Sequence, residues 1–389
     1  MKKNNLFSKS MLKNIDWFLL IIVVAIVIYG AIAVTSATSP GFSGEDMTFE
    51  EYLGQLDWSY AGLQLIFFGI GIAAIIVLLF LDYNNLRDFS NIMYWIMVAL
   101  LVAVWLFGQT INGTTGWFKI GNRGIQPAEF CKILMIVVLA KEFAQRTEGK
   151  TEGITRFRDI WPMLWRFLIP FGLILLQPDW GSAMVYAVVF IGLLFMSKTS
   201  FKIIGSLLGG ALAMLPVAWL FMADYQKERI YTFFDPSRDT EGSGFHMLRA
   251  KIVGSSGGLN GKGLFSDDLL TQQGNYLPEK QTDFIFAATS EAVGFVGGMI
   301  LIILYGLLIY RLIRLSMRAK DDFGTYLILG VSFMLLFHVF ENIGMNIGLM
   351  PVTGIPLPLF SYGGSNMLTM MLALGLVLNV NMRRTRYNI

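Results

Sequence analysis

The sequence predicts an all-α polytopic membrane protein with ten transmembrane helices. Hydrophobic residues make up 55% of the 389 residues, charged residues make up only 15%, and the mean hydropathy is +0.59. Soluble domains are less apolar and carry more charge. The apolar residues gather into runs close to the roughly 20 residues that a helix needs to cross a bilayer. We therefore expect residues 1–389 to form a single transmembrane domain, with no nucleic-acid partner.

The first predicted span follows four lysines and runs from Trp17 to Val34. It is too long for a typical cleaved signal sequence, and no clear small-residue cleavage site follows it, so we expect an uncleaved span. Nine further spans are predicted at 63–81, 92–107, 127–140, 163–176, 183–196, 201–222, 284–310, 327–349 and 367–380. An even number of spans places both termini on the same side of the membrane.

The basic residues indicate which side that is. With the termini in the cytoplasm, 20 of the 30 lysines and arginines fall on the cytoplasmic side. Most of the remainder lie in the long segment 223–282, which the positive-inside rule largely exempts because of its length. We therefore predict cytoplasmic termini and one long extracellular loop, 223–282.

This loop is the only long non-membrane segment, and loops of such length are usually functional or partly helical. Residues 246–253 are predicted to form a surface helix. The glycine run 254–263 resembles a phosphate-binding loop but fails that pattern at two positions. Two interpretations stay open: a flexible linker, or a loop whose N–H groups approach an anionic group with the help of Lys262.

The acid at the end of this loop is the leading functional candidate. Asp283 lies where the polar segment meets the apolar run that follows it. An ionisable group at the membrane surface is a functional candidate by default. The alternative is that Asp283 neutralises Lys280 or caps the next helix. The residues alone leave both interpretations open.

Other polar side chains interrupt the apolar pattern. Glu129 and Lys132 share one helical face and are expected to form an ordinary i,i+3 pair. Asp179 follows Gln177-Pro178 and is compatible with a simple turn. Glu291 lies in the eighth predicted span, where burial of an unpaired carboxylate would be costly, so it needs a partner or a water-filled cavity. Residues 348–365 contain three prolines and cannot form a regular helix.

The sequence has few side chains suited to bind a metal through cysteine or histidine or to form a histidine-dependent catalytic triad. The sequence has a single cysteine, Cys131, which excludes an internal disulfide and a cysteine-based metal cluster. Its two histidines leave few groups for a histidine metal site or a Ser-His-Asp triad. Physical arguments leave two classes: a transporter with broken helices near a central site, or an enzyme that acts at the outer face on a lipid-anchored substrate.

Several motifs resemble those of the SEDS family (shape, elongation, division and sporulation). They are Gln177-Pro-Asp-Trp-Gly181, Pro278-Glu-Lys-Gln-Thr-Asp-Phe-Ile-Phe286, Asn342-Ile-Gly-Met345, Pro351-Val-Thr-Gly-Ile-Pro-Leu-Pro358 and Ser361-Tyr-Gly-Gly-Ser365. The resemblance spans essentially the whole chain. Gln177 and Lys280 resemble the elongation members more than the division members, whereas Trp180 and Gln281 depart from the expected Leu and His.

The resemblance implies a peptidoglycan glycosyltransferase of the bacterial cytoplasmic membrane that polymerises lipid II into glycan strands during cell elongation. It also implies a class B penicillin-binding protein as the transpeptidase partner, together with other membrane proteins of the elongation complex. The alternatives are a lipid II flippase and the division paralogue. A divalent cation, Mg²⁺ or Mn²⁺, is a possible cofactor, which Asp283 would position.

The resemblance places the family's essential acid on Asp283, which we expect to be the catalytic base. Trp117, in Thr115-Gly-Trp-Phe-Lys-Ile-Gly121, matches another functionally sensitive family position. The residues expected to bind substrate are Lys280, Glu279, Arg229, Lys262, Trp117, Asp179 and Ser361. Glu129, Lys132 and Glu291 are expected to be structural polar residues.

Overall fold

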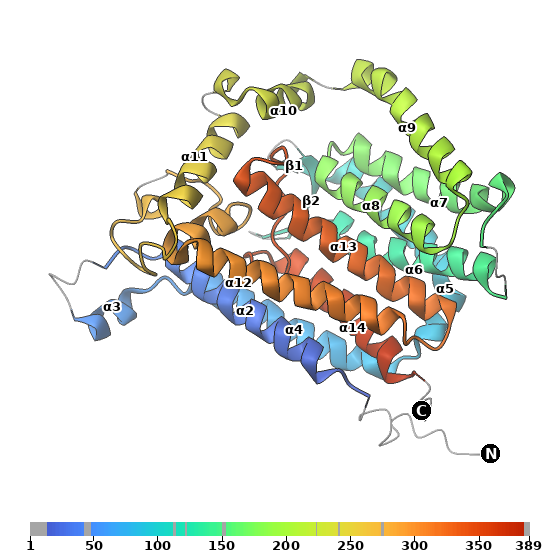
Figure 1. The fold of residues 1–389 in the computed structure, drawn as a ribbon, viewed down its shortest axis with the longest axis horizontal. Helices are drawn as coiled ribbons and strands as arrows, with labels where there is room; N and C mark the ends of the chain where they lie inside the picture. Colours follow the sequence, from blue (N-terminus) through green and yellow to red (C-terminus); the bar gives the residue numbers. More distant parts are fainter. Residues whose placement is uncertain are drawn as a thin grey trace.

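The computed structural model describes residues 14–42, 48–111, 114–120, 123–149, 153–222, 224–239, 242–273 and 276–384. Within these ranges the protein is mostly helical (Figure 1). Each predicted span coincides with a helix: α2 (Trp17–Thr38), α4 (Ser59–Phe80), α5 (Tyr83–Phe107), α6 (Pro127–Thr147), α7 (Phe157–Leu176), α8 (Trp180–Met196), α9 (Phe201–Phe221), α12 (Ile285–Ser316), α13 (Asp322–Ile347) and α14 (Gly364–Met382).

Eight of these helices are long and apolar enough to cross a membrane by length and composition. The other two are α8, which has 17 residues, and α6, which carries five charged residues. Several helices extend beyond the predicted spans through polar turns. For example, Asp321 caps α13 by accepting a hydrogen bond from the Gly324 amide.

Helix α13 is at the centre of the bundle. It packs against α6, α8 and α12, while α14 packs against α4 (Figure 1). Helix α9 stands apart from the other helices, and only 11% of its apolar window is buried. The start of α2 meets the end of α14, where the Asn381 side chain donates to the Asn14 carbonyl at 2.7 Å. The two ends of the described chain therefore lie on the same side of the bundle.

A small antiparallel sheet joins α5 to α6. Its strands are β1 (Gln109–Ile111), β2 (Thr114–Ile120) and β3 (Arg123–Ile125), in the order β1-β2-β3. We did not predict this sheet. The residues that favour it are the β-branched and aromatic side chains of 110–120 and the Gly-Asn pair at 121–122, a common turn sequence.

The long segment before α12 is partly helical. It contains α10 (Asp224–Phe234), a short 3₁₀ turn (Pro236–Arg238), α11 (Ser243–Ser256) and a second 3₁₀ turn (Leu270–Gln272). Helix α11 confirms the surface helix predicted at 246–253. A further short helix, α3 (Phe49–Gln55), begins with a capping box between Thr48 and Glu51.

Helix α12 is interrupted at Gly294, where φ is +71° and the backbone is not helical. The glycine run fills this gap with four hydrogen bonds: the amides of Lys262 and Gly263 donate to the carbonyls of Glu291 and Ala292, and those of Phe295 and Val296 donate to the carbonyls of Gly258 and Leu259. A Cβ on Gly294 would lie 2.3 Å from the Gly261 nitrogen, so this approach requires glycine. The run is therefore neither a flexible linker nor an open anion-binding loop.

The segment between α13 and α14 is non-helical, as the prolines predict. It starts at Gly348, which ends α13 in the left-handed conformation. Gln64 of α4 donates to the carbonyls of Leu359 and Phe360 within it. The segment is thereby covered by protein, the condition under which irregular backbone is tolerated in a membrane protein.

Candidate active site

A cavity of about 620 Å³ lies at the end of the bundle where α6, α8, α12 and α14 begin. Its wall combines the small sheet, the segment before α12, and the proline-containing segment before α14. Five of the residues singled out in the sequence line it: Trp117, Glu129, Asp179, Glu279 and Asp283. The fold thus brings together side chains from four separate parts of the chain.

Asp283 is partly exposed to this cavity. Among the described residues, no N–H or O–H group donates to its carboxylate. Gly354, with φ of +78°, passes so close that a Cβ there would lie 3.4 Å from the Asp283 Oδ2 atom. The carboxylate therefore faces a space that a ligand can enter.

The surroundings raise the pKa of Asp283 to about 7. The main cause is burial, which disfavours the charged form. The negative charge of Glu279 raises the pKa further, whereas the positive charge of Arg229 on α10 lowers it. A carboxylate with a pKa near neutrality is suited to accept and release a proton.

Two asparagines of α13 hold the backbone of Asp283. The side-chain nitrogens of Asn342 and Asn346 both donate to the Asp283 carbonyl at 2.9 Å. Asn346 also accepts the Ala287 amide at 3.0 Å, and Asn342 donates to the Ile355 carbonyl at 2.8 Å. In the sequence, Asn342 was identified only as the first residue of the Asn342-Ile-Gly-Met345 motif, and Asn346 was not identified. The signal was the i,i+4 spacing of two amides in an apolar helix.

Trp117 lies on β2 and packs over Gly124 of β3, where a Cβ would come within 2.8 Å of its ring. The Thr115 amide donates to the Gln177 carbonyl at 3.2 Å, which attaches the strand to the turn between α7 and α8. The aromatic side chain is thus held rigidly at the cavity wall by the sheet.

Asp179 has a structural role in addition to its place at the cavity. It caps α8 by accepting the Ser182 amide at 3.0 Å, and it accepts the Gln126 side chain at 2.7 Å. Nearby, Glu129 and Lys132 form the predicted i,i+3 ion pair at 2.6 Å, with both side chains buried. His338 of α13 lies 3.2 Å from the Lys132 ammonium.

Four expected substrate-binding residues do not line the cavity. The Lys280 ammonium donates to the Thr271 carbonyl, and Lys262 pairs with Glu291 at 2.7 Å. Ser361 accepts the Leu357 amide at 2.8 Å inside its own turn. Arg229 is close enough to influence the pKa of Asp283 but is not part of the lining.

The charge of the cavity is unusual for an anion site. Its lining contains four carboxylates and, among the described residues, no lysine or arginine. The backbone offsets part of the negative charge of these carboxylates, because four helices start here and helix N-termini carry partial positive charge. Of these, α6, α12 and α14 have no side-chain cap, and α14 begins at the glycines of Tyr362-Gly363-Gly364. An anionic group would find N–H donors at the start of α14, because α6 begins with Pro127, which has no N–H, and the Ala287 amide of α12 donates to Asn346.

No three of the described His, Cys, Asp and Glu side chains come together as a metal-binding group. A site built entirely from protein ligands therefore does not fit. A cation held by Asp283 and by the oxygens of a phosphorylated ligand does fit, because Mg²⁺ commonly takes one or two carboxylates and completes its shell with phosphate oxygens and water.

These features define a class: a polytopic helical membrane protein with a polar cavity at one end of the bundle and a partly exposed acid of raised pKa inside it. Comparison with known proteins gives the family. The family model of FtsW, RodA and SpoVE, described as cell cycle protein, matches residues 16–386. The chain belongs to this family.

Characterised relatives support the assignment over nearly the full length. The chain is 34% identical to the peptidoglycan glycosyltransferase MrdB of Escherichia coli over 377 residues, covering 95% of this chain and 94% of that protein. It is 35% identical to stage V sporulation protein E of Bacillus subtilis, covering 96% and 98%. The family and the apolar helices together make this a multi-pass protein of the bacterial cytoplasmic membrane.

Solved structures share the fold. A chain of a peptidoglycan synthase complex, described as coordinating polymerization and crosslinking, has a TM-score of 0.73 at 30% identity, covering 94% of this chain and 97% of that one. The Rod shape determining protein RodA of Thermus thermophilus has a TM-score of 0.68 at 28% identity, covering 96% and 98%. The SEDS resemblance is therefore confirmed.

Proposed function

We propose that this protein is a peptidoglycan glycosyltransferase that polymerises lipid II at the outer face of the membrane during cell elongation. The observation that carries the proposal is Asp283: a carboxylate with a pKa of about 7 and no donor among the described residues, in a cavity of about 620 Å³. Named relatives with this activity cover nearly the whole chain.

In the proposed reaction the Asp283 carboxylate takes the proton from a sugar hydroxyl as that oxygen bonds to the anomeric carbon of the donor. The bond between this carbon and the pyrophosphate oxygen breaks, and the lipid pyrophosphate leaves with the electron pair. General base catalysis of this kind contributes ~10²–10⁴ in rate. Because one carboxylate acts on the sugar, the displacement inverts the anomeric centre in a single step.

The pyrophosphate is assigned to the start of α14, which lines the cavity and has no side-chain cap. This replaces the lysines predicted from the sequence, since Lys262 and Lys280 are engaged elsewhere. In the alternative to the role of base, Asp283 would hold Mg²⁺ or Mn²⁺, and the cation would supply positive charge to the pyrophosphate. The chain's own residues supply the base, the N-terminus of α14 and, from Arg229, a positive charge near the site.

The proposed topology has ten spans, with α6 and α8 crossing the membrane as polar or short helices in the interior of the bundle. The termini lie in the cytoplasm, and the segment 223–282 lies outside within a single domain, 1–389. The proposed partner is a class B penicillin-binding protein within the elongation complex, supported by the likeness to a chain of a polymerising and crosslinking complex.

Purified protein incubated with lipid II, with and without the transpeptidase, tests the proposal. We expect glycan ladders on gels from the parent protein, and none from Asp283→Asn. Transport of lipid II across vesicles without polymer would instead identify a flippase. Ladders of normal yield from Asp283→Asn would refute the assignment of the base.

A further inference from the structure

The first turns of α12 form a short helix of their own, because the helix is interrupted at Gly294. The break at Gly294 leaves residues 285–293 as a short helix whose backbone hydrogen bonds do not continue into 295–316. Asp283 lies two residues before the first residue of this short helix. Its position therefore depends on whatever holds the short helix in place from the side.

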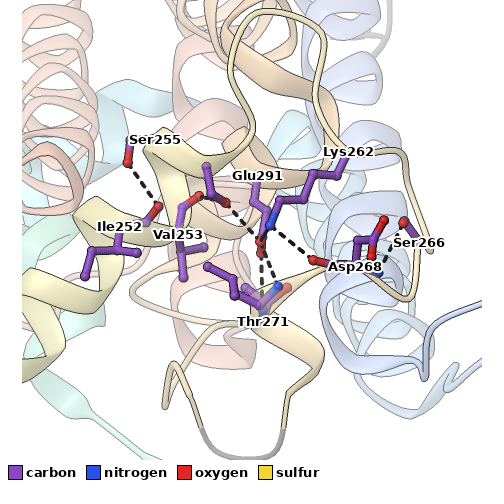
Figure 2. A network of polar contacts seen from close by, with 10 residues as sticks. Ile252, Val253, Ser255, Lys262, Ser266, Asp268, Thr271 and Glu291 are labelled. Carbon is purple, nitrogen blue, oxygen red and sulfur yellow. Dashed lines mark hydrogen bonds and ion pairs between the residues drawn. The ribbon is translucent and has the colours of Figure 1, made fainter.

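Glu291, at the far end of the short helix, attaches this helix to the outer segment through hydrogen bonds (Figure 2). Its carboxylate is fully buried and accepts four hydrogen bonds from the outer segment. The donors are the Lys262 ammonium at 2.7 Å, the Ser256 hydroxyl at 3.1 Å, the Leu270 amide at 2.7 Å and the Thr271 amide at 3.1 Å. These donors come from α11, the glycine run and the second 3₁₀ turn, so one side chain gathers three parts of the segment.

The residues that bind Glu291 also contact the segment just before Asp283. Thr271 donates its amide to Glu291 and accepts the Lys280 ammonium at its carbonyl. Lys280 is three residues before Asp283. The short helix is thus restrained at both ends from the outer segment, while Asn342 and Asn346 restrain the Asp283 carbonyl from the α13 side.

We infer that Glu291 is a positioning residue for Asp283, an inference that rests on the proposed function. The buried carboxylate fixes the orientation of residues 285–293 and so sets the place of the base relative to the cavity. It does not touch the substrate, because neither Glu291 nor Lys262 lines the cavity. Misplacing a reacting group by about 1 Å costs ~10²-fold in rate, and this is the size of effect expected when the hold is lost.

Glu291→Gln tests the inference with a near-isosteric change. The carboxamide presents an NH₂ group where a second oxygen now accepts, so either the Thr271 amide or the Leu270 amide faces a donor. We expect kcat for polymerisation to fall ~10²-fold with a much smaller change in KM. Amide hydrogen exchange should rise in 258–263 and 285–296 and stay unchanged in α13. Asp268→Asn, which removes an exposed carboxylate from the same segment, should alter neither quantity.

Lys262→Met provides a second variant, which keeps Glu291 and its backbone donors, and its unfolding temperature is measured beside its kcat. We expect a smaller loss of kcat, restored by Lys262→Arg. Parental kcat in both Glu291→Gln and Lys262→Met, with Asp283→Asn inactive, would overturn the inference and leave the proposed function intact. A fall in kcat without altered exchange would also overturn it. Full activity of Asp283→Asn would instead refute the proposed function. The exchange measurement would still show whether Glu291 fixes residues 285–293 to the outer segment.

Discussion

Asp283 and Glu291 are two carboxylates eight residues apart, at opposite ends of the same short helix, and their environments differ completely. Glu291 is fully buried and accepts four hydrogen bonds. Asp283 faces a cavity, and no described residue donates to its carboxylate. The difference separates a structural acid from the proposed catalytic one, and in the sequence Asp283 follows a polar segment whereas Glu291 lies inside the apolar run.

The difference also has an energetic meaning. A buried carboxylate with a full set of donors is stabilising relative to one that has lost them, because each unsatisfied group retains its desolvation cost. An acid held without donors is unfavourable for folding, and such groups are common at functional sites. Substitution at either position should therefore lower activity, but only substitution of Glu291 should also lower stability.

The largest effect is expected for Asp283→Asn. Loss of the base should lower polymerisation by ~10²–10⁴-fold, while the unfolding temperature in detergent stays equal or rises, because an unfavourable charge is removed. Lipid II polymerisation and thermal unfolding of the same preparation measure both quantities. Glu50→Gln on α3, an exposed acid far from the cavity, is the control and should leave both unchanged. A large drop in unfolding temperature would show that Asp283 is a structural acid after all.

Glu291→Ala should, unlike Asp283→Asn, lower the stability of the protein. Removal of the carboxylate leaves the Lys262 ammonium and two backbone amides without their acceptor, and breaking a buried pair in this way costs about 3–5 kcal/mol. Unfolding titrations in mixed micelles would measure the loss. Asp16→Ala breaks the buried pair with Arg311 at the other end of the bundle, so it should match the loss of stability without lowering kcat of the folded protein. Unchanged stability of Glu291→Ala would contradict the structural role.

Asn346→Ala tests the other side of the short helix and should have an intermediate effect. It removes one of two donors to the Asp283 carbonyl and the acceptor of the Ala287 amide, which costs about 1–3 kcal/mol. We expect kcat to fall as well, since Asn342 alone then binds the Asp283 carbonyl from the α13 side. Asn379→Ala is the matched control: this buried amide donates to Leu78 and Leu81 far from the cavity. A similar loss of kcat in both variants would mean that the effect is general destabilisation.

The span pattern could be predicted from the sequence because apolar runs of this length have few alternatives in a membrane protein. Helix ends were less well predicted, since capping turns such as Asp321 lie outside the apolar runs. The sheet before α6 was missed because its strands are three to seven residues long and contain glycine. Periodicity over so few residues does not distinguish a strand from a loop.

The cavity was predicted only in part, for a physical reason. Asp283 and Trp117 were identified from motifs, and both line the cavity. Lys262 was assigned to the substrate because it adds positive charge to the glycine run, and Lys280 because it lies three residues before Asp283. Their side chains instead point to Glu291 and Thr271, which are up to 29 residues away in the chain. Side-chain direction in an irregular segment depends on tertiary partners that no local pattern specifies.

The smallest and most specific effect is expected in the pH dependence. A base must be ionised to act, so kcat/KM should fall as the pH drops through about 7, the pKa of Asp283. Arg229→Met removes a positive charge that lowers this pKa, so the acidic limb should move to higher pH. Glu279→Gln removes a negative charge that raises it, so the limb should move to lower pH. Both shifts should shrink at high salt, because charges near solvent are screened. Glu51→Gln on the distant α3 should leave the limb in place, and limbs that coincide in all three variants would mean that Asp283 is not the titrating group.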